Sequence, residues 1–335
     1  MKKVLLYGLM GLVFLSACDK KDDNEDAGGQ DDPGQITNEI PFDQLPASEA
    51  ILTVGGTTTY VNVMENKRKS LPTFPNLKVK ANKAIGYVKD TYGRPLKNAS
   101  IGLSSSLVGG SSTPSFGYTN DKGYYEIEIP FGATYYYNAG YTLDFEGSRA
   151  ALGLYPADGQ MASFPGPDGT VENFVLLPYG QGDPDRVATE PHFANNYFGG
   201  CLTLSWSLRE GALPPPGSLP IGMVVEIKLT PLSLLHAAEK KTFIIRKTVQ
   251  YSSLNILNLP LGKYKIEVST TTNGKLVLEE TGYNPRAQQY GLFPKAGDNT
   301  TTSYTHITVP ASADATRALP FRGAWESPGI TIRLQ

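Results

Sequence analysis

The folded part of this sequence has almost no net charge. The chain has 30 basic and 32 acidic residues. Without Lys2, Lys3 and the stretch 19–32, which holds seven acidic residues and two lysines, 26 basic and 25 acidic residues remain. Binding to nucleic acid depends mainly on neutralising phosphate charge. A neutral body offers no footprint for DNA or RNA, so we exclude nucleic acid as a partner.

Catalytic motifs are scarce as well. The sequence contains no Gly-x-Ser-x-Gly turn and no phosphate-binding glycine loop, and its strand patterns do not alternate with helical ones. The three histidines are His192, His236 and His306. His236 and Glu239 have the spacing of a zinc-binding pair, but a zinc enzyme needs a third ligand and an open position. We predict no catalytic residue, no cofactor and no metal site, and keep a metal-dependent hydrolase as an alternative.

Long hydrophobic runs are absent apart from one near the N-terminus, from Val4 to Leu15, which follows two lysines. It is too short to span a membrane stably and has the arrangement of an export signal. The run ends in Leu15-Ser-Ala-Cys18, which resembles the lipobox of bacterial lipoproteins. The resemblance implies that residues 1–17 are a signal peptide and that Cys18 carries the lipid.

Residues 18–35 are rich in acidic side chains and contain no large apolar residue, so we predict a solvated tether. Lys21-Asp-Asp23 resembles the surface-export signal of Bacteroidota-type outer-membrane lipoproteins. The resemblance implies a lipid anchor in the outer membrane with the body facing the cell exterior. An acidic linker that faces the periplasm is the alternative.

Cysteine is the other scarce residue, since the chain has only Cys18 and Cys201. If Cys18 carries lipid, Cys201 has no partner for a disulfide, and apolar cores must stabilise the fold. In the pattern that follows it, Leu202 and Leu204 share one strand face, and Cys201 lies on the other. No histidine is near in sequence, so we interpret Cys201 as a structural thiol.

Strand patterns and turns are what the sequence has in abundance. Between Ala84 and Asp144, three strand patterns are separated by turn signals, as an antiparallel sandwich requires. This stretch resembles the carboxypeptidase regulatory-like family, which has a seven-stranded transthyretin-like sandwich. The resemblance rests on the motifs Gly86–Asp90, Gly93–Leu96, Ala99–Ile101, Thr119–Ile127 and Pro130–Gly132. It implies a scaffold domain over residues 81–178.

The rest of the body also has strand patterns. Residues 36–80 contain two short strand patterns around Gly55-Gly56, which predict a hairpin and a connecting segment. Residues 179–195 have linker composition, and residues 196–335 show regularly spaced strand patterns that resemble fibronectin type III or immunoglobulin-like domains. We expect Trp206 and Tyr264 in the second core. The predicted fold is therefore all-β, with two antiparallel β-sandwiches in tandem.

These features favour a non-catalytic surface lipoprotein that acts as a binding or scaffold module. It could belong to a glycan-capture system, with Tyr136, Tyr197 and Trp325 as exposed rings that stack on sugars. Core packing is the other interpretation of the tyrosine-rich strand around Tyr136, and the one we prefer. A structural or adhesive spacer that binds outer-membrane protein partners is the alternative function. In either case Cys18 supplies the contact with the membrane.

Overall fold

The computed structural model describes residues 36–65, 67, 69–106, 110, 112–145, 148–271, 274–280, 300–307, 319–323 and 329–335. The predicted signal peptide, Cys18, the predicted tether and Trp325 lie outside these residues. Within the described part most elements are strands, and the α-helix there, α1 (Pro184–Thr189), has six residues. No helix in it is long and apolar enough to cross a bilayer. The predicted all-β fold is confirmed.

The first sandwich is built from the segment between residues 83 and 176. Its elements are β3 (Lys83–Asp90), β4 (Ser100–Ser106), β5 (Ser112–Tyr118), β6 (Tyr124–Glu128), β7 (Ala133–Phe145), β8 (Ser148–Gly153), β9 (Tyr155–Pro156), β10 (Phe164–Pro165), η2 (Gly166–Asp168), β11 (Thr170–Val171) and β12 (Phe174–Leu176). One sheet has the order β11-β3-β12-β9, with β6 paired to β3. The other has the order β10-β7-β4-β5, with β8 paired to β7.

Strand β6 shows the alternation that its sequence predicts. Tyr125 and Ile127 are buried in the core, and the intervening Glu126 is exposed. Tyr124 lies on the outer face but is also buried, because Phe74 from the segment before β3 packs in the same cluster. The connecting segment therefore covers part of the outer face of this sheet.

The turn before β6 requires a glycine. Asn120 Oδ1 accepts hydrogen bonds from the backbone N–H groups of Lys122 (2.9 Å) and Tyr124 (3.1 Å). Gly123 has a φ of 73°, and a Cβ at this position would lie 2.5 Å from the carbonyl oxygen of Val88. Only glycine adopts this conformation so close to the neighbouring strand without strain. The turn thereby fixes the pairing of β6 with β3.

The second sandwich also has two five-stranded sheets. Its strands are β1 (Glu49–Val54), β2 (Tyr60–Asn62), β13 (Gly200–Ser205), β14 (Val224–Leu234), β15 (Thr242–Thr248), β16 (Ser253–Leu259), β17 (Gly262–Thr270), β18 (Leu276–Glu280), β19 (Thr302–Ile307) and β20 (Gly329–Leu334). The sheet orders are β1-β15-β14-β17-β19 and β18-β20-β13-β16-β2. Trp206 and Tyr264 are buried in the core between them, as predicted.

The predicted hairpin around Gly55-Gly56 is wrong. Strand β1 pairs with β15 in one sheet and β2 pairs with β16 in the opposite sheet, both in parallel. The loop between them crosses from one sheet to the other. Val54 from β1 lies in the core between the sheets, and Val61 from β2 packs against it. The two strands cover edges that would otherwise be open, which a free hairpin would not do.

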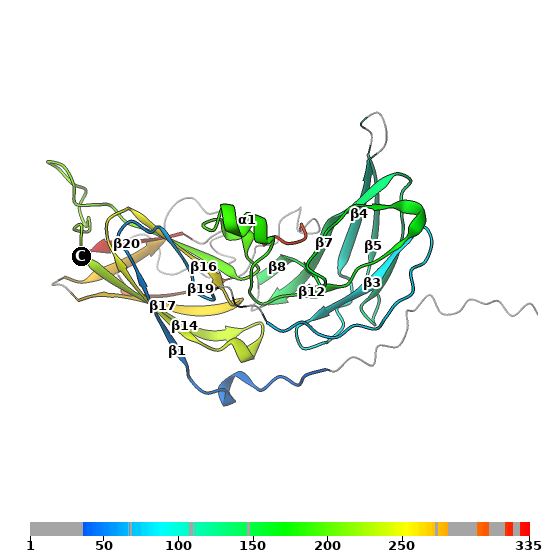
Figure 1. The fold of residues 1–335 in the computed structure, drawn as a ribbon. Coiled ribbons are helices and arrows are strands. Elements are labelled where there is room, and N and C mark those ends of the chain that lie inside the picture. The colour runs from blue at the N-terminus through cyan, green and yellow to red at the C-terminus, as the bar shows by residue number, and fades with distance from the viewer. Residues whose placement is uncertain are drawn as a thin grey trace, which may run out of the picture.

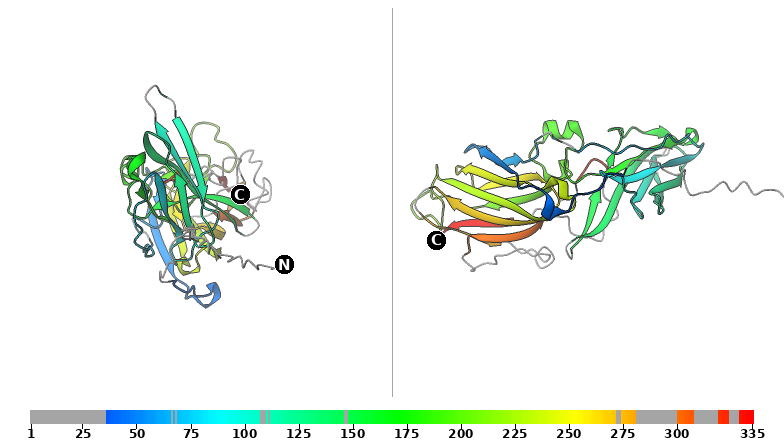
Figure 2. Two further views of the ribbon diagram at one scale, coloured as in Figure 1. Left: turned by 90° about the vertical axis from the view of Figure 1, so that its right-hand side faces the viewer. Right: turned by 90° about the horizontal axis from the view of Figure 1, so that it is seen from below.

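Because β1 and β2 belong to the second sandwich, the first sandwich is inserted between β2 and β13 of the second. Figure 1 shows blue β1 in the same part of the molecule as β14 and β17, away from cyan β3. The two sandwiches lie end to end along one long axis (Figure 2). The predicted tandem order, with the first sandwich before the second, therefore holds only from β3 onward, because β1 and β2 of the second sandwich precede β3.

Asn258 connects the two places where the chain crosses between sandwiches. Its Oδ1 accepts hydrogen bonds from the N–H groups of Gly180 (2.8 Å) and Gly199 (3.2 Å), and its Nδ2 donates to Asn62 Oδ1 (3.0 Å). Asn258 is buried and has a φ of 61°, a conformation that Asn tolerates better than most residues. Residues 177–199 lead from the first sandwich back to the second, and we call them the return segment. The end of β2 and the return segment are thus held together. The return segment, predicted as a linker, contains α1 and continues into η3 (Ala194–Asn196).

Candidate functional site

His236 lies at the junction of the two sandwiches. It precedes a short 3-10 helix, η4 (Ala237–Glu239), and its Nδ1 is 3.1 Å from Thr91 Oγ1 of the first sandwich. The Tyr92 ring meets the imidazole edge-on, with 4.9 Å between ring centroids. Burial lowers the pKa of His236 to about 3, and the positive charges of Arg94 and Lys69 act in the same direction. His236 is therefore a neutral, buried contact between the sandwiches.

Glu39, in the segment before β1, adds a second connection at the junction. Its Oε1 accepts a hydrogen bond from the N–H of Ala237 (2.6 Å), and its Oε2 is 3.4 Å from Arg94 Nη1. Arg94 Nε in turn pairs with Asp90 Oδ2 at 2.5 Å. Since Thr37 N–H also donates to the Tyr92 carbonyl (2.8 Å), the segment 37–39 is bonded to both sandwiches.

Glu239 is paired with the connecting segment between β2 and β3. Lys69 Nζ is 3.0 Å from Glu239 Oε1, and the Glu239 side chain is 9% exposed. Burial, and secondarily the charge of Glu239, raises the pKa of Tyr179 to about 12. The carboxylate of Glu239 thus contacts groups from two separate chain segments.

The alternative of a metal-dependent hydrolase requires His236 and Glu239 to ligate one ion. In the structure His236 pairs with Thr91, whereas Glu239 pairs with Lys69. The described residues contain no group of three His, Cys, Asp or Glu side chains that could hold a metal ion. The His-x-x-Glu spacing here serves contacts between the sandwiches.

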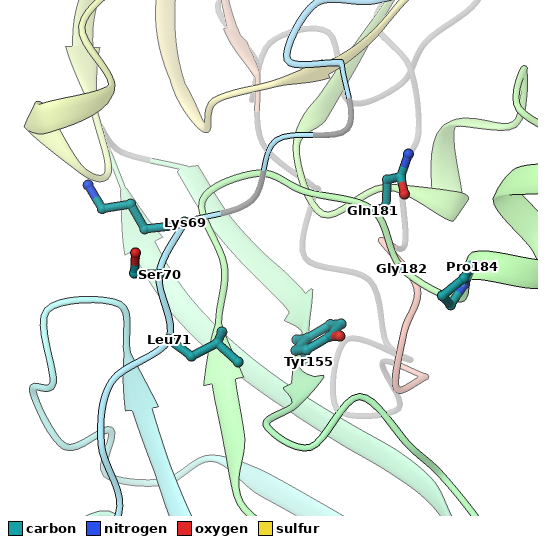
Figure 3. A pocket seen from close by; sticks show the side chains of 7 residues that line it. All are labelled: Lys69, Ser70, Leu71, Tyr155, Gln181, Gly182 and Pro184. Atoms are coloured by element: carbon teal, nitrogen blue, oxygen red, sulfur yellow. The ribbon is translucent and has the colours of Figure 1, made fainter.

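A polar cleft of about 350 Å³ opens beside these contacts (Figure 3). Lys69, Ser70 and Leu71 line it from the connecting segment, and Gln181, Gly182 and Pro184 line it from the return segment. Tyr155 of β9 lies between the two groups. Its ring meets Phe198 and Phe321 edge-on, with centroid distances of 5.8 and 5.5 Å, so it is held in place. The cleft offers polar side chains on a fixed aromatic base, which suits binding of a small polar ligand.

Two of the three predicted stacking residues are not exposed. Tyr136 is 7% exposed, and its hydroxyl lies 3.3 Å from that of Tyr125 in the first core. Tyr197 is 1% exposed and its hydroxyl donates to the carbonyl of Pro191 (2.7 Å). The prediction that these two rings stack on a ligand is therefore wrong, and the preferred interpretation of core packing is confirmed for Tyr136. Trp325 lies outside the described residues and stays a prediction.

The error at Tyr136 has a local cause. Strand β7 has a register shift opposite Gly102 and Leu103, where Tyr136 pairs with Leu103 and Asn138 pairs with Gly102. Tyr136 enters the core, and Tyr135 is 40% exposed. Burial alternates regularly from Ala133 to Tyr136, but a run of three tyrosines does not show which ring faces the core.

Cys201 behaves as predicted from its strand. It is buried in a small cluster with Tyr197 and Leu257, and it forms no disulfide within the described residues. Leu202 and Leu204 lie on the other face, in the main core of the second sandwich.

Sequence reasoning missed Glu39, Lys69, Asp90 and Arg94 at the junction. Asp90 and Arg94 lie in a turn that the sequence marks, but the partners of Glu39 and Lys69 lie on η4, more than 150 positions away. Sequence spacing carries no signal for such pairs. Only the insertion of one sandwich into the other brings these segments together.

Comparisons with known proteins give no relative from which to argue. No family model matches the chain, and no curated protein matches it. Among solved structures, a 9R-lipoxygenase from Cyanothece is 17% identical with a TM-score of 0.17, over 30% of this chain and only 18% of the lipoxygenase. The shaft pilin SpaA from Lactobacillus rhamnosus GG is 8% identical with a TM-score of 0.21, over 70% of this chain and 99% of the pilin. A C-terminal fragment of the pilus adhesin SpaC from the same organism is 12% identical with a TM-score of 0.21, over 75% and 95%. Similarities this low carry no conclusion about this chain.

Proposed function

We propose that this protein is a lipid-anchored surface module that binds or presents a partner outside the cell and performs no catalysis. The observation that carries the proposal is the junction. Three segments of the chain cross or bridge it, and buried polar contacts around His236 and Glu39 fix the sandwiches to each other. A rigid pair of sandwiches is a suitable support for binding surfaces on loops and sheet faces.

The membrane part of the proposal rests on Cys18 and the acidic stretch after it. Acylation of Cys18 would attach the chain to the outer membrane, and residues 18–35 would separate the body from the lipid. Lys21–Asp23 would direct it to the outer face. A structural or adhesive spacer remains the second candidate function, favoured by the end-to-end arrangement of the sandwiches (Figure 2).

The test uses the full-length chain and a Cys18→Ser variant. Cells grown with a clickable palmitate analogue should label the natural chain and not the variant. Protease added to intact cells should degrade the labelled chain, because the body faces outward. A natural chain without label, or one protected until the outer membrane is opened, would contradict the anchored, outward-facing module.

Chemical cross-linking on intact cells separates the two functions. A spacer should cross-link to outer-membrane proteins, whereas a glycan-binding module should be released from isolated cell surfaces by competing sugar. The control is the Cys18→Ser variant, which should give neither result at the membrane.

A further inference from the structure

A second cavity, of about 360 Å³, lies next to the cleft of Figure 3. Asp183 lines it, and the flanking Gly182 and Pro184 line the cleft, so the two are neighbours on either side of the return segment. The other side chains used below are Tyr135, Tyr137, Arg186 and Arg322. They come from β7 of the first sandwich, from α1 and from the described segment 319–323.

Tyrosine rings of β7 form one wall of this cavity. Tyr135 is 40% exposed and Tyr137 is half-buried. The Tyr137 ring covers Gly102, where a Cβ would come within 3.1 Å of it, and Phe116 meets it edge-on at 5.4 Å between centroids. A ring held in this way loses little conformational entropy when a ligand stacks on it. Its apolar face suits the C–H face of a sugar ring.

Charged side chains form the facing wall. Arg186 is about half exposed, and its Nε is 3.8 Å from Asp183 Oδ2, a loose ion pair. Arg322 lines the same cavity, and its Nε is buried without a hydrogen-bond partner among the described residues. Two guanidinium groups against one carboxylate leave a net positive charge, and guanidinium groups match carboxylates in geometry.

We propose that this cavity binds a pyranose that carries a carboxylate, namely a uronic-acid unit of an acidic polysaccharide. The sugar ring stacks on Tyr135 and Tyr137, and its carboxylate accepts hydrogen bonds from Arg322 and Arg186. A neutral sugar would leave the two guanidinium groups without a carboxylate from the ligand, and an apolar ligand would desolvate the charged wall without compensation. The inference rests on the proposed binding function and names its ligand class.

The test measures binding to the full chain, purified in detergent, by isothermal titration. The probes are oligomers of galacturonate, glucuronate and mannuronate, each beside its methyl ester, which keeps the ring and removes the charge. We expect saturable binding of at least one acid and binding of its ester weaker by roughly 10- to 100-fold, as loss of charged hydrogen bonds predicts. Absence of binding by all three acids, or equal binding of acid and ester, overturns the proposal.

Variants assign the binding to this cavity. Tyr135→Ala should weaken binding of the acid and of the ester alike, by about three- to tenfold, because it removes stacking. Arg322→Gln should weaken binding of the acid and leave that of the ester unchanged, so that the difference between acid and ester becomes smaller while Arg186 still contributes. If Arg322→Gln does not fold, the exposed Arg186→Gln serves the same purpose. Tyr118→Ala, a ring that is 62% exposed on the same sheet but not in the cavity, is the matched control and should bind as the natural chain does. Binding that Tyr135→Ala leaves unchanged contradicts the site.

The result of the uronate-binding test does not depend on the result of the test of the proposed function. If the chain is labelled and displayed at the surface but binds no uronate, only the uronate-binding proposal is contradicted. If the chain binds uronate in detergent but is neither lipidated nor displayed, the site is supported and the proposal of an anchored surface module is contradicted.

Discussion

At the scale of single residues, His236 shows how a polar side chain can stabilise a contact between domains without chemistry. Its neutral ring is enclosed by Thr91, Tyr92 and the rest of the junction. Protonation would place a charge in this enclosed space beside two other cations. The contact should therefore depend on pH in a way that can be assigned to this one residue.

The pKa of His236 is about 3 in the folded protein and close to 6.5 in the unfolded chain, chiefly because of burial. Below pH 6.5 the unfolded state binds a proton that the folded state does not, so stability falls as the pH drops from 6.5 toward 3. At pH 5 this contribution is about 2 kcal/mol. Urea unfolding at pH 8 and pH 5 should show that acidification changes the stability of the natural chain less favourably than that of His236→Gln, by this amount.

The comparison has to be made between variant and natural chain at each pH. Burial, together with the charge of Asp158, raises the pKa of Glu172 to about 8. Its effect has the opposite sign, since it destabilises the fold as the pH rises toward 8. If His236→Gln and the natural chain lose stability equally on acidification, the imidazole is not the group responsible.

The burial of a residue could be predicted from the sequence where its neighbours in the same strand determine it. Trp206 and Tyr264 follow from alternation within their own strands, and both are in the core. At Tyr136 two interpretations stayed open, because in a run of three tyrosines the residue types do not show which ring faces the core. The sequence could not predict the contacts of His236, because Thr91 lies 145 positions away in a different sandwich.

At the scale of elements, the loop between β1 and β2 depends on one buried lysine. Lys247 of β15 donates from Nζ to the carbonyl oxygens of Gly55 (2.6 Å), Gly56 (2.8 Å) and Thr58 (2.7 Å). These bonds hold the loop where it crosses between the sheets. The lysine thus adds to the turn hydrogen bond that the Thr58 N–H donates to the Gly55 carbonyl (3.2 Å).

Lys247→Met should lower the free energy of unfolding by about 1–3 kcal/mol, because the three carbonyl groups of the loop lose their donor while the cost of burying the ammonium is removed. Hydrogen exchange should become faster in β1 and β2 than in β14. The matched control is Lys228→Met on β14, whose ion pair with Glu49 is exposed and should matter by less than about 0.5 kcal/mol. Unchanged stability of Lys247→Met would show that the loop does not need these bonds.

The positions of strands were easier to predict than their partners. Alternation predicted strands at 51–54 and 57–63, and β1 and β2 lie within or near these ranges. Nearness in sequence then favoured pairing the two with each other. Their partners, β15 and β16, follow almost 200 positions later, and parallel pairing over that distance leaves no pattern in a single sequence.

At the scale of the whole molecule, the insertion makes the first sandwich separable. Its core comes almost entirely from residues 84–176, with Leu261 and Leu235 as the contributors from outside. The two crossing points lie close together, since Val63 bonds to Leu257 and Gly199 bonds to Asn258. Removing the insert should therefore leave ends that a short linker can join.

We expect a fragment of residues 80–179 to fold, with near-UV circular dichroism and a cooperative thermal transition. A chain in which residues 66–196 are replaced by a short Gly-Ser linker should also fold, because β1 and β2 can still reach β15 and β16. Its control is the same chain starting at residue 63, which lacks β1 and β2 and should aggregate through open sheet edges. A fragment without cooperative unfolding would mean that the sandwiches depend on each other.

Insertion also imposes an order of events on the newly made chain. Strands β1 and β2 emerge first, yet Glu49 pairs with Thr242 and Tyr60 with Asn255, so both strands wait while the entire first sandwich is synthesised and folds. During that interval their apolar side chains and unpaired backbone groups are accessible to other chains. For the outer-membrane lipoprotein proposed above, this early segment would be the natural place for a chaperone to bind, and the last strands to arrive would be the ones that release it.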